Sequence, residues 1–329
     1  AHRGAGGRKM KIAYDIAAIG EAVIDMVPYA QGPSGNPAYE ACPGGAPVNC
    51  LAAAAALGAG CAFIGAAGDD FMGDYLSAKL SSAGVDTSGL IRTDGAFTTM
   101  AFVAQDMLRE RSFTFVRKPG ADMLLDKSGV NTDIIDNCRI LHFGTLLMSG
   151  EASREAQRYA IDYAKSKGRM LSYDVNLRPG VFGSEREEKA AVQELIGAAD
   201  VIKVTAEEMA YITGESEHRI EQGAEKLMQD GKAAVFVTMG ARGAYYISEN
   251  ERGFVRAFEV NAVDTLACGD AFMGAVLYML ARKPDNMLRE TVNFACAVGA
   301  LAAQVRGGMQ SVPSMREVRE FIEAHPRFS

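Results

Sequence analysis

The chain has 329 residues, of which 48% are hydrophobic and 23% charged, and its formal net charge is −7; this is enough apolar material for one large core or two medium ones. The basic residues form no cluster, so we expect no nucleic-acid partner. The six cysteines and four histidines are dispersed, which argues against a zinc site and is typical of buried thiols in a reducing cytoplasm.

The N-terminal residues are considered apart from the fold. We interpret residues 1–9 as a tag remnant or leader, because Met10 is a natural first residue. The stretch after it contains Lys11 and Asp15, and therefore lacks the apolar region of a signal peptide. The least polar run, residues 51–68, is interrupted by glycines and is a poor membrane span. We expect residues 10–329 to form a single domain without a membrane partner.

Strands and helices are expected to alternate along most of the chain. The predicted strands are residues 12–19, 62–66, 139–143, 170–174, 201–204 and 233–239. The predicted helices are residues 48–57, 71–82, 151–166, 271–280, 288–305 and 315–324. This alternation indicates an α/β fold with parallel strand pairing and helices on both faces of the sheet.

One region departs from the alternation. Residues 98–103 and 111–117 are rich in β-branched and aromatic residues, and the charged residues 106–110 lie between them. This pattern predicts a β-hairpin. A hairpin inserted into an α/β fold is typical of a lid or a dimer contact; the alternative is an ornament at the edge of the sheet.

Several common catalytic motifs are missing from the sequence. It contains no Walker A motif, no serine elbow and no H-E-x-x-H. The pair Gly58 and Gly60 does not continue into G-x-G-x-x-G, and it precedes a predicted strand instead of following one. A Rossmann dehydrogenase is therefore disfavoured.

The strongest chemical signal is the segment VDTLACGDAFMGAVLYML. A predicted strand, residues 254–260, leads into it, and a predicted helix follows. The small residues 267–269 would leave backbone amides free at the helix start, where amides and helix dipole together bind phosphate or an oxyanion. Asp270 in the first turn would accept the proton of an attacking hydroxyl group. The alternative is that Asp270 only complements the helix dipole, which contributes about 0.3–1 kcal/mol.

This segment resembles the second signature of the ribokinase-like (PfkB-type) sugar kinases, usually D-T-x-G-A-G-D. In total, seven sequence segments over residues 12–313 resemble motifs of this family and occur in the family's order. One of them, residues 44–76, is similar to the family's first signature. Each segment alone could be a turn or a surface feature. The evidence for the resemblance is therefore the presence of all seven in the family's order. It implies a three-layer α/β sandwich with a mostly parallel central sheet and a small β-hairpin lid. The lid segments would lie near residues 21–43 and 95–120.

The resemblance also implies a set of sugar-binding and catalytic residues. The expected sugar-binding residues are Asp25, Gly44, Gly45, Asn49, Arg117 and Asp270. Asp270 would be the catalytic base, amides of Ala267, Cys268 and Gly269 would neutralise the moving phosphoryl group, and Arg178 in SYDVNLRPG would add positive charge. Arg117, in the segment RSFTFVRKPGADMLL, is expected to be an exposed lid residue that reaches the substrate.

Nucleotide and metal sites are implied in the same way. The residues expected to bind ATP are Lys203, Thr205, Thr238, Gly240, Gly243 and Gly269. Glu208 would order water on Mg²⁺, and Asp264 and Ser311 would contribute to a K⁺ site. The sequence departs from the family pattern at Ala267, Cys268, Thr205 and Cys296; Thr205 replaces an asparagine that contacts metal or phosphate, and Cys296 weakens the assignment of the adenine site.

The implied reaction is phosphoryl transfer from ATP to a sugar hydroxyl in the cytoplasm. Ala46 and Pro47 follow the paired glycines where kinases of sugar phosphates have lysine, so the chain is most similar to fructokinases, which make fructose 6-phosphate. The first alternative is 2-keto-3-deoxygluconate, whose carboxylate Arg117 and Lys118 would bind; a nucleoside or aminoimidazole riboside is the next. A non-catalytic sugar- or nucleotide-binding regulator would need neither Asp270 nor the amide cradle. A homodimer through the lid is expected.

Overall fold

The computed structural model describes residues 12–326 except residues 33, 106–110, 229–230, 283 and 285–286. Residues 1–9 and the predicted turn at residues 106–110 therefore lie outside the described residues.

The largest sheet contains nine strands. In spatial order they are β13 (Arg252–Arg256), β12 (Gly243–Ile247), β11 (Ala234–Thr238), β10 (Val201–Thr205), β9 (Met170–Asp174), β8 (Cys138–Phe143), β1 (Tyr14–Ile19), β4 (Cys61–Gly68) and β5 (Val85–Thr93). Neighbouring strands from β11 to β5 pair in parallel, whereas β12 and β13 form an antiparallel edge. The mostly parallel α/β sheet expected from the sequence is therefore confirmed.

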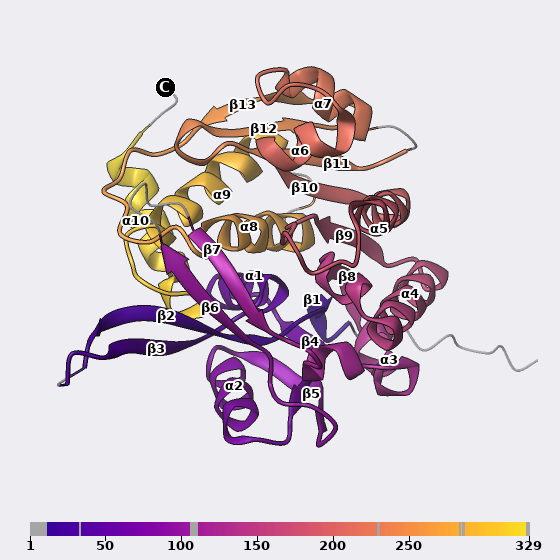
Figure 1. Cartoon of the computed structure of the whole chain (residues 1–329). Coiled ribbons are helices and arrows are strands. Elements are labelled where there is room, and N and C mark those ends of the chain that lie inside the picture. The colour runs from indigo at the N-terminus through magenta and orange to yellow at the C-terminus, as the bar shows by residue number, and fades with distance from the viewer. Residues whose placement is uncertain are drawn as a thin grey trace, which may run out of the picture.

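Helices cover both faces of this sheet (Figure 1). One face carries α1 (Ala46–Ala56), α2 (Phe71–Ser82), α8 (Cys268–Arg282), α9 (Leu288–Ala302) and α10 (Met315–Ala324). The other carries α3 (Thr132–Asp136), α4 (Glu151–Ser166), α5 (Glu185–Ala198), α6 (Ala206–Thr213) and α7 (Ile220–Leu227). Short 3₁₀ turns are η1 (Ala121–Leu124), η2 (Lys127–Gly129), η3 (Leu146–Ser149), η4 (Gly240–Arg242) and η5 (Met309–Ser311). Within the described ranges, no helix is both long and apolar enough to cross a membrane.

Strand β1 shows why the layers form. Its side chains alternate between the two faces: Ile16 and Ala18 join the core under α1 and α8, whereas Ala17 and Ile19 join the core under α3 and α4. All four are fully buried. A strand buried on both faces is a continuous apolar run, as in other parallel sheets covered by helices.

The lid is a second sheet of four strands, β3 (Pro37–Gly44), β2 (Val23–Gln31), β6 (Met100–Gln105) and β7 (Arg111–Val116), in that order. The predicted hairpin is β6 and β7, and the other expected lid segment, residues 21–43, contains β2 and nearly all of β3; β2 pairs in parallel with β6 and antiparallel with β3. Val27, Cys42 and Val103 form a small core in this sheet, and Leu266, from the loop before α8, packs against it. The lid is thus anchored beside the start of α8.

Two predicted elements end earlier than expected. The predicted strand at residues 254–260 is β13, which ends at Arg256, and the predicted helix at residues 288–305 is α9, which ends at Ala302. After β13 the chain crosses to the end of α9, where the N–H groups of Val263 and Asp264 donate to the carbonyl of Ala303. This contact uses a carbonyl that lacks an intrahelical partner and brings the loop before α8 into position.

Arg117 lies inside the lid junction, and the expectation that it is an exposed residue reaching the substrate is wrong. Its side chain is 5% exposed, and its Nη2 lies 2.7 Å from Oδ2 of the fully buried Asp122. Nη1 donates to Ser149 Oγ at 2.7 Å, and Nη2 donates to the Leu146 carbonyl at 3.2 Å. The second oxygen of Asp122 accepts the hydroxyl of Thr99. A buried carboxylate requires a cation, and Arg117 supplies it at the end of β7.

We expect Arg117→Met to lower the free energy of unfolding by about 3–5 kcal/mol, because it leaves the Asp122 charge buried without a partner. Urea denaturation measures this loss. The double variant Arg117→Met/Asp122→Leu should recover part of the stability, since it removes both charges. Arg178→Met, which breaks no ion pair, is the matched control. A change within about 0.5 kcal/mol, as at an ordinary surface position, would show that the Arg117 ion pair does not hold the lid junction.

Candidate active site

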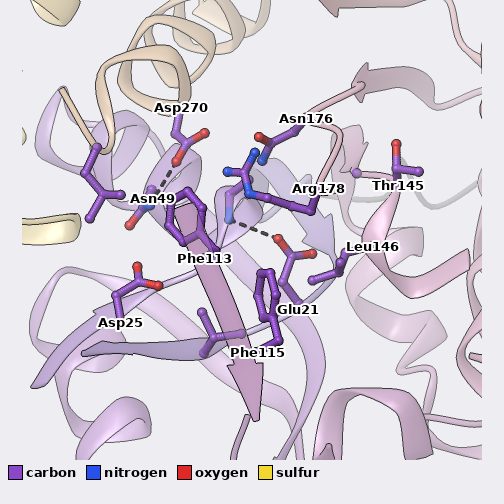
Figure 2. Close-up of a pocket in the computed structure, with 15 residues that line it drawn as sticks. Glu21, Asp25, Asn49, Phe113, Phe115, Thr145, Leu146, Asn176, Arg178 and Asp270 are labelled. Atoms are coloured by element: carbon purple, nitrogen blue, oxygen red, sulfur yellow. Dashed lines mark hydrogen bonds between the residues drawn. The ribbon is translucent and has the colours of Figure 1, made fainter. Parts of the chain in front are cut away.

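A pocket lies between the lid and the carboxyl ends of the parallel strands (Figure 2). Open α/β sheets bind their ligands at this edge. The pocket is lined by polar and apolar groups from both layers: Glu21, Asp25, Gly45, Ala46, Asn49, Phe113, Phe115, Thr145, Leu146, Asn176, Arg178, Leu266 and Asp270 are among them. Five of the residues predicted from the sequence are therefore brought together here: Asp25, Gly45, Asn49, Arg178 and Asp270.

Asp270 lies in the first turn of α8, as predicted, and is 7% exposed. Asn49 Nδ2, from α1, donates to its Oδ2 at 2.8 Å. Burial raises the pKa of Asp270 to about 6, and the nearby Asp174 carboxylate acts in the same direction, whereas Lys203 and the Asn49 hydrogen bond oppose the shift. A carboxyl group with a pKa close to neutral can accept a proton from a substrate and release it readily.

The start of α8 presents backbone amides without a protein acceptor. In the described part of the chain, the N–H groups of Ala267, Gly269 and Asp270 donate to no protein acceptor. The Cys268 N–H differs from the expectation, because it points toward the Thr265 carbonyl at 3.4 Å. Its thiol turns back toward the Asp264 carbonyl, 3.7 Å away. The predicted amide cradle thus consists of three amides, which is a suitable arrangement for an anion at a helix N-terminus.

A buried cation lies beside this cradle. Lys203 Nζ is 2.9 and 3.1 Å from the two oxygens of Asp174, and both side chains are buried. A Cβ on Gly269 would lie 3.2 Å from the same Nζ. Burial lowers the pKa of Lys203, but the carboxylates of Asp174, Glu208 and Asp270 outweigh that effect and raise it. Lys203 therefore remains charged next to the free amides.

Glu208 holds the loop that carries Arg178. Its Oε2 accepts the Thr205 N–H at 2.8 Å and the Thr205 hydroxyl accepts the Glu208 N–H, which is a capping box at the start of α6. Oε1 of Glu208 accepts the N–H of Leu177 at 2.8 Å. Both carboxylate oxygens thus have structural partners, and the predicted contact of Glu208 with metal-bound water stays a prediction.

Arg178 faces the pocket. Its guanidinium carbon lies 5.2 Å from the centre of the Phe113 ring, on lid strand β7. Within the described residues it forms no ion pair, and its Nη1 donates to the Leu177 carbonyl. Asn176 beside it has a positive φ of 41°, which Asn tolerates better than most residues. Arg178 therefore offers charge to a ligand.

Gly44 and Gly45 lie so close to Asp25 and Glu21 that a side chain at either position would clash. A Cβ on Gly44 would lie 2.2 Å from Asp25 Oδ2. Gly45 has a φ of 112°, and a Cβ there would lie 2.6 Å from the Glu21 carbonyl. Asp25 itself is 6% exposed. The glycines thus allow the start of α1 to approach the strand that carries Asp25.

The residues predicted to bind nucleotide lie at neighbouring strand ends. Thr205 and Thr238 are paired in register where β10 and β11 end. Gly240 follows in an exposed turn. Gly243 has another reason to be glycine, because a Cβ there would lie 2.0 Å from the Val255 carbonyl on β13. Its predicted contact with nucleotide stays a prediction.

The predicted cation site lies at the loop after α9. Asp264 Oδ1 accepts the Leu266 N–H at 2.8 Å, and Oδ2 accepts the Gly307 N–H at 3.1 Å. Ser311 is buried, and its hydroxyl donates to the Gly308 carbonyl. Among the described residues, no group of three or more His, Cys, Asp or Glu side chains could hold a metal. A monovalent ion here would depend on carbonyl oxygens, and a divalent ion would depend mainly on its ligand's phosphates.

Several pocket residues were missed from the sequence, among them Glu21, Phe113 and Phe115. Glu21 precedes the first residue of β2, Val23, so the alternation of side chains along a strand gives no signal for it. The phenylalanines alternate in RSFTFV and therefore share a face of β7. Arg117, which follows them, does not line the pocket.

Comparison with known proteins agrees with this geometry. The family model for pfkB family carbohydrate kinases matches residues 13–315. Fructokinase-1 of Oryza sativa subsp. japonica is 36% identical over 316 residues, covering 94% of this chain and 98% of the relative, and Fructokinase-2 of Solanum lycopersicum is 35% identical over 315 residues, covering 94% and 96%. The crystal structure of fructokinase with bound ATP from Xylella fastidiosa superposes with a TM-score of 0.86 at 31% identity, covering 95% of this chain and all of that chain.

The fructokinase from Vibrio cholerae O395, in a form with bound fructose, ADP and calcium, has a TM-score of 0.84 at 31% identity and covers 94% of this chain and 99% of that chain. The family match spans nearly the whole sheet, from β1 to the start of α10, and includes every element that lines the pocket. The chain belongs to the pfkB family of carbohydrate kinases.

Proposed function

We propose that the protein transfers the γ-phosphoryl group of ATP to a hydroxyl of D-fructose, giving fructose 6-phosphate. The observation that carries this proposal is the position of Asp270, a buried carboxylate with a raised pKa that lines the pocket next to three unbonded amides. The relatives named as fructokinases support the choice of sugar. A non-catalytic regulator would need neither the acid nor the amides.

The roles follow from the charges. Phosphoryl transfer depends mainly on positioning and on stabilising charge in the transition state. Asp270 would orient the acceptor hydroxyl and take its proton, while the amides of Ala267, Gly269 and Asp270, with Lys203 beside them, would stabilise the transferring group. Arg178 would add charge from the acceptor side. Magnesium, when bound with ATP, neutralises phosphate oxygens, and Glu208 would contact its water shell.

The acceptor is proposed to be neutral. The alternative acceptor, 2-keto-3-deoxygluconate, carries a carboxylate for which Arg117 and Lys118 were the expected partners. Arg117 is occupied by Asp122, so one of those two cations is not offered to the pocket. Arg178 remains the pocket cation that would bind a carboxylate, and the two acceptors must be compared directly.

Three further features belong to the proposal. A K⁺ ion would bind near Asp264 and Ser311 beside the cradle, and phosphorylation rates in K⁺ and Na⁺ buffers test this. The six cysteines are all free thiols, which suits the reducing cytoplasm, and subcellular fractionation tests that location. Two copies of the chain would associate through their lids.

We expect Asp270→Asn to reduce kcat roughly 10²–10⁴-fold, because the amide cannot accept the proton although it fits the same space. ATP binding, measured by calorimetry, should stay near that of the wild type. Cys268→Ala is the matched control and should keep most activity, since its side chain faces away from the cradle. A loss in kcat of less than about tenfold for Asp270→Asn would remove Asp270 from the role of base.

The pH dependence gives a second readout of the same group. Asp270 must be ionised to act as a base, and its pKa is raised from 3.8 to about 6. The kcat of the wild type should therefore rise with pH through about 6 and level off above it. The residual rate of Asp270→Asn should lack this step.

D-fructose should have the highest kcat/KM in a panel of common neutral sugars, measured by coupled ADP release. Asp25→Ala should raise the KM for fructose far more than the KM for ATP, because it removes a carboxylate that lines the sugar pocket. A higher kcat/KM for 2-keto-3-deoxygluconate than for fructose would make that acid the substrate instead.

The lid strands expose the large apolar side chains Tyr29, Tyr39 and Val116, which are typical of an interaction surface when they gather on one element. We expect Val116→Glu to convert a dimer into a monomer in light scattering coupled to size exclusion. Phe71→Glu is the control, because Phe71 is a still more exposed apolar residue but lies on α2, outside the lid sheet. A wild type that is monomeric at micromolar concentration would contradict the proposed dimer.

A further inference from the structure

Glu21 is a buried acid that the mechanism above does not use. It lies between β1 and β2 and is 6% exposed. Its Oε1 accepts the N–H of Ala46, at the start of α1, at 3.1 Å. Its Oε2 has no hydrogen-bond partner among the described residues. Buried polar atoms in proteins nearly always have a partner, and leaving one without costs stability.

The unpartnered oxygen belongs to a group that lines the sugar pocket. Figure 2 shows the carboxyl groups of Glu21, Asp25 and Asp270 on different sides of the same space, with Arg178 between Glu21 and Asp270. The bond from Ala46 to Oε1 suffices to hold Glu21 to α1. It therefore does not explain why the second carboxyl oxygen of a residue that lines the pocket is buried without a partner among the described residues.

The surroundings leave Glu21 close to its own midpoint at neutral pH. Burial raises its pKa to about 7; Asp122 also raises it, whereas backbone N–H groups, including that of Ala46, and the charge of Arg117 lower it. At neutral pH this group can either accept or donate a hydrogen bond. When ionised, Oε2 accepts the hydrogen bond of a sugar hydroxyl, which the side-chain nitrogen of a glutamine cannot do.

We propose that Glu21 positions the acceptor sugar, with Oε2 hydrogen-bonded to a hydroxyl other than the one that Asp270 activates. This inference rests on the proposed sugar kinase activity and extends it. Asp25 and Glu21 then bind separate hydroxyls, and Asp270 acts on a third. A site built to hydrogen-bond a hydroxyl discriminates strongly against an analogue that lacks it, because the buried group of the protein is left unpaired.

The test combines variants of Glu21 with sugars that lack one hydroxyl at a time. Glu21→Gln keeps a carbonyl for the Ala46 N–H and keeps the side-chain volume, but it replaces the acceptor oxygen at the other position. We measure kcat/KM for D-fructose and for its 1-deoxy, 3-deoxy and 4-deoxy analogues with both proteins. We expect Glu21→Gln to lose roughly 10–100-fold with fructose, and to lose little with the one analogue that lacks the hydroxyl bound by Glu21.

Asp25→Asn is the matched comparison, and its loss should vanish with a different analogue from that of Glu21→Gln. The KM for ATP and the thermal midpoint of Glu21→Gln should stay near those of the wild type. Should Glu21→Gln not fold, Glu21→Asp replaces it, because the shorter acid withdraws the second oxygen from the pocket while remaining a carboxylate.

The results separate this inference from the proposed function. If fructose is phosphorylated but Glu21→Gln loses activity equally with fructose and with every analogue, or loses none, Glu21 acts only through the fold and the inference is overturned while the kinase stands. If the wild type phosphorylates neither fructose nor any other sugar of the panel, both are overturned.

Discussion

Close packing of α8 against α1 is the constraint on which the site depends. A Cβ on Gly274, in the middle of α8, would lie 2.4 Å from the Cys50 carbonyl on α1 and 2.8 Å from the Ala53 side chain. Helices whose contact positions carry small residues can approach more closely than the usual interaxial distance. This approach lets Asn49 on α1 reach Asp270 on α8 although 221 positions separate them in the sequence. A larger residue at 274 would move Asp270 away from the pocket.

The charges at this edge of the sheet have to be balanced for an anionic substrate. Asp174, Glu208 and Asp270 lie near one another, and Lys203 is the buried cation among them. Burying the Asp174–Lys203 pair has a desolvation cost that its attraction does not always offset. Its value here is electrostatic, because Lys203 fixes a positive charge next to the free amides of the cradle. The site is thus suited to an anion in a place where carboxylates alone would repel one.

The parts of the site that depend on local sequence could be predicted, whereas those that depend on tertiary packing could not. The small residues before Asp270 specify a helix start with free amides, and the structure has that helix start. A lid segment near residues 21–43 was expected, but its strands β2 and β3 were not, because β2 contains Pro28 and mixes polar with apolar residues. The pairing of β2 with β6 is also distant in sequence. The burial of Arg117 depends on its ion pair with Asp122. Asp122 is fully buried, and no pattern in the sequence predicts that burial. The lack of a partner for Glu21 Oε2 likewise depends on tertiary packing beside the start of α1.

The lid contributes apolar wall to the pocket and also contacts the pocket cation, Arg178. Phe113 and Phe115 on β7 form part of the wall, and the Phe113 ring lies over the Arg178 guanidinium. A cation held against an aromatic face is oriented without losing its charge to a carboxylate. Arg178 is held from the other side by its loop, whose Leu177 amide is bound by Glu208. Arg117 and Asp122 fix the end of the strand that carries Phe113. The orientation of Arg178 therefore depends on the ion pair at the lid junction, because Phe113 contacts Arg178.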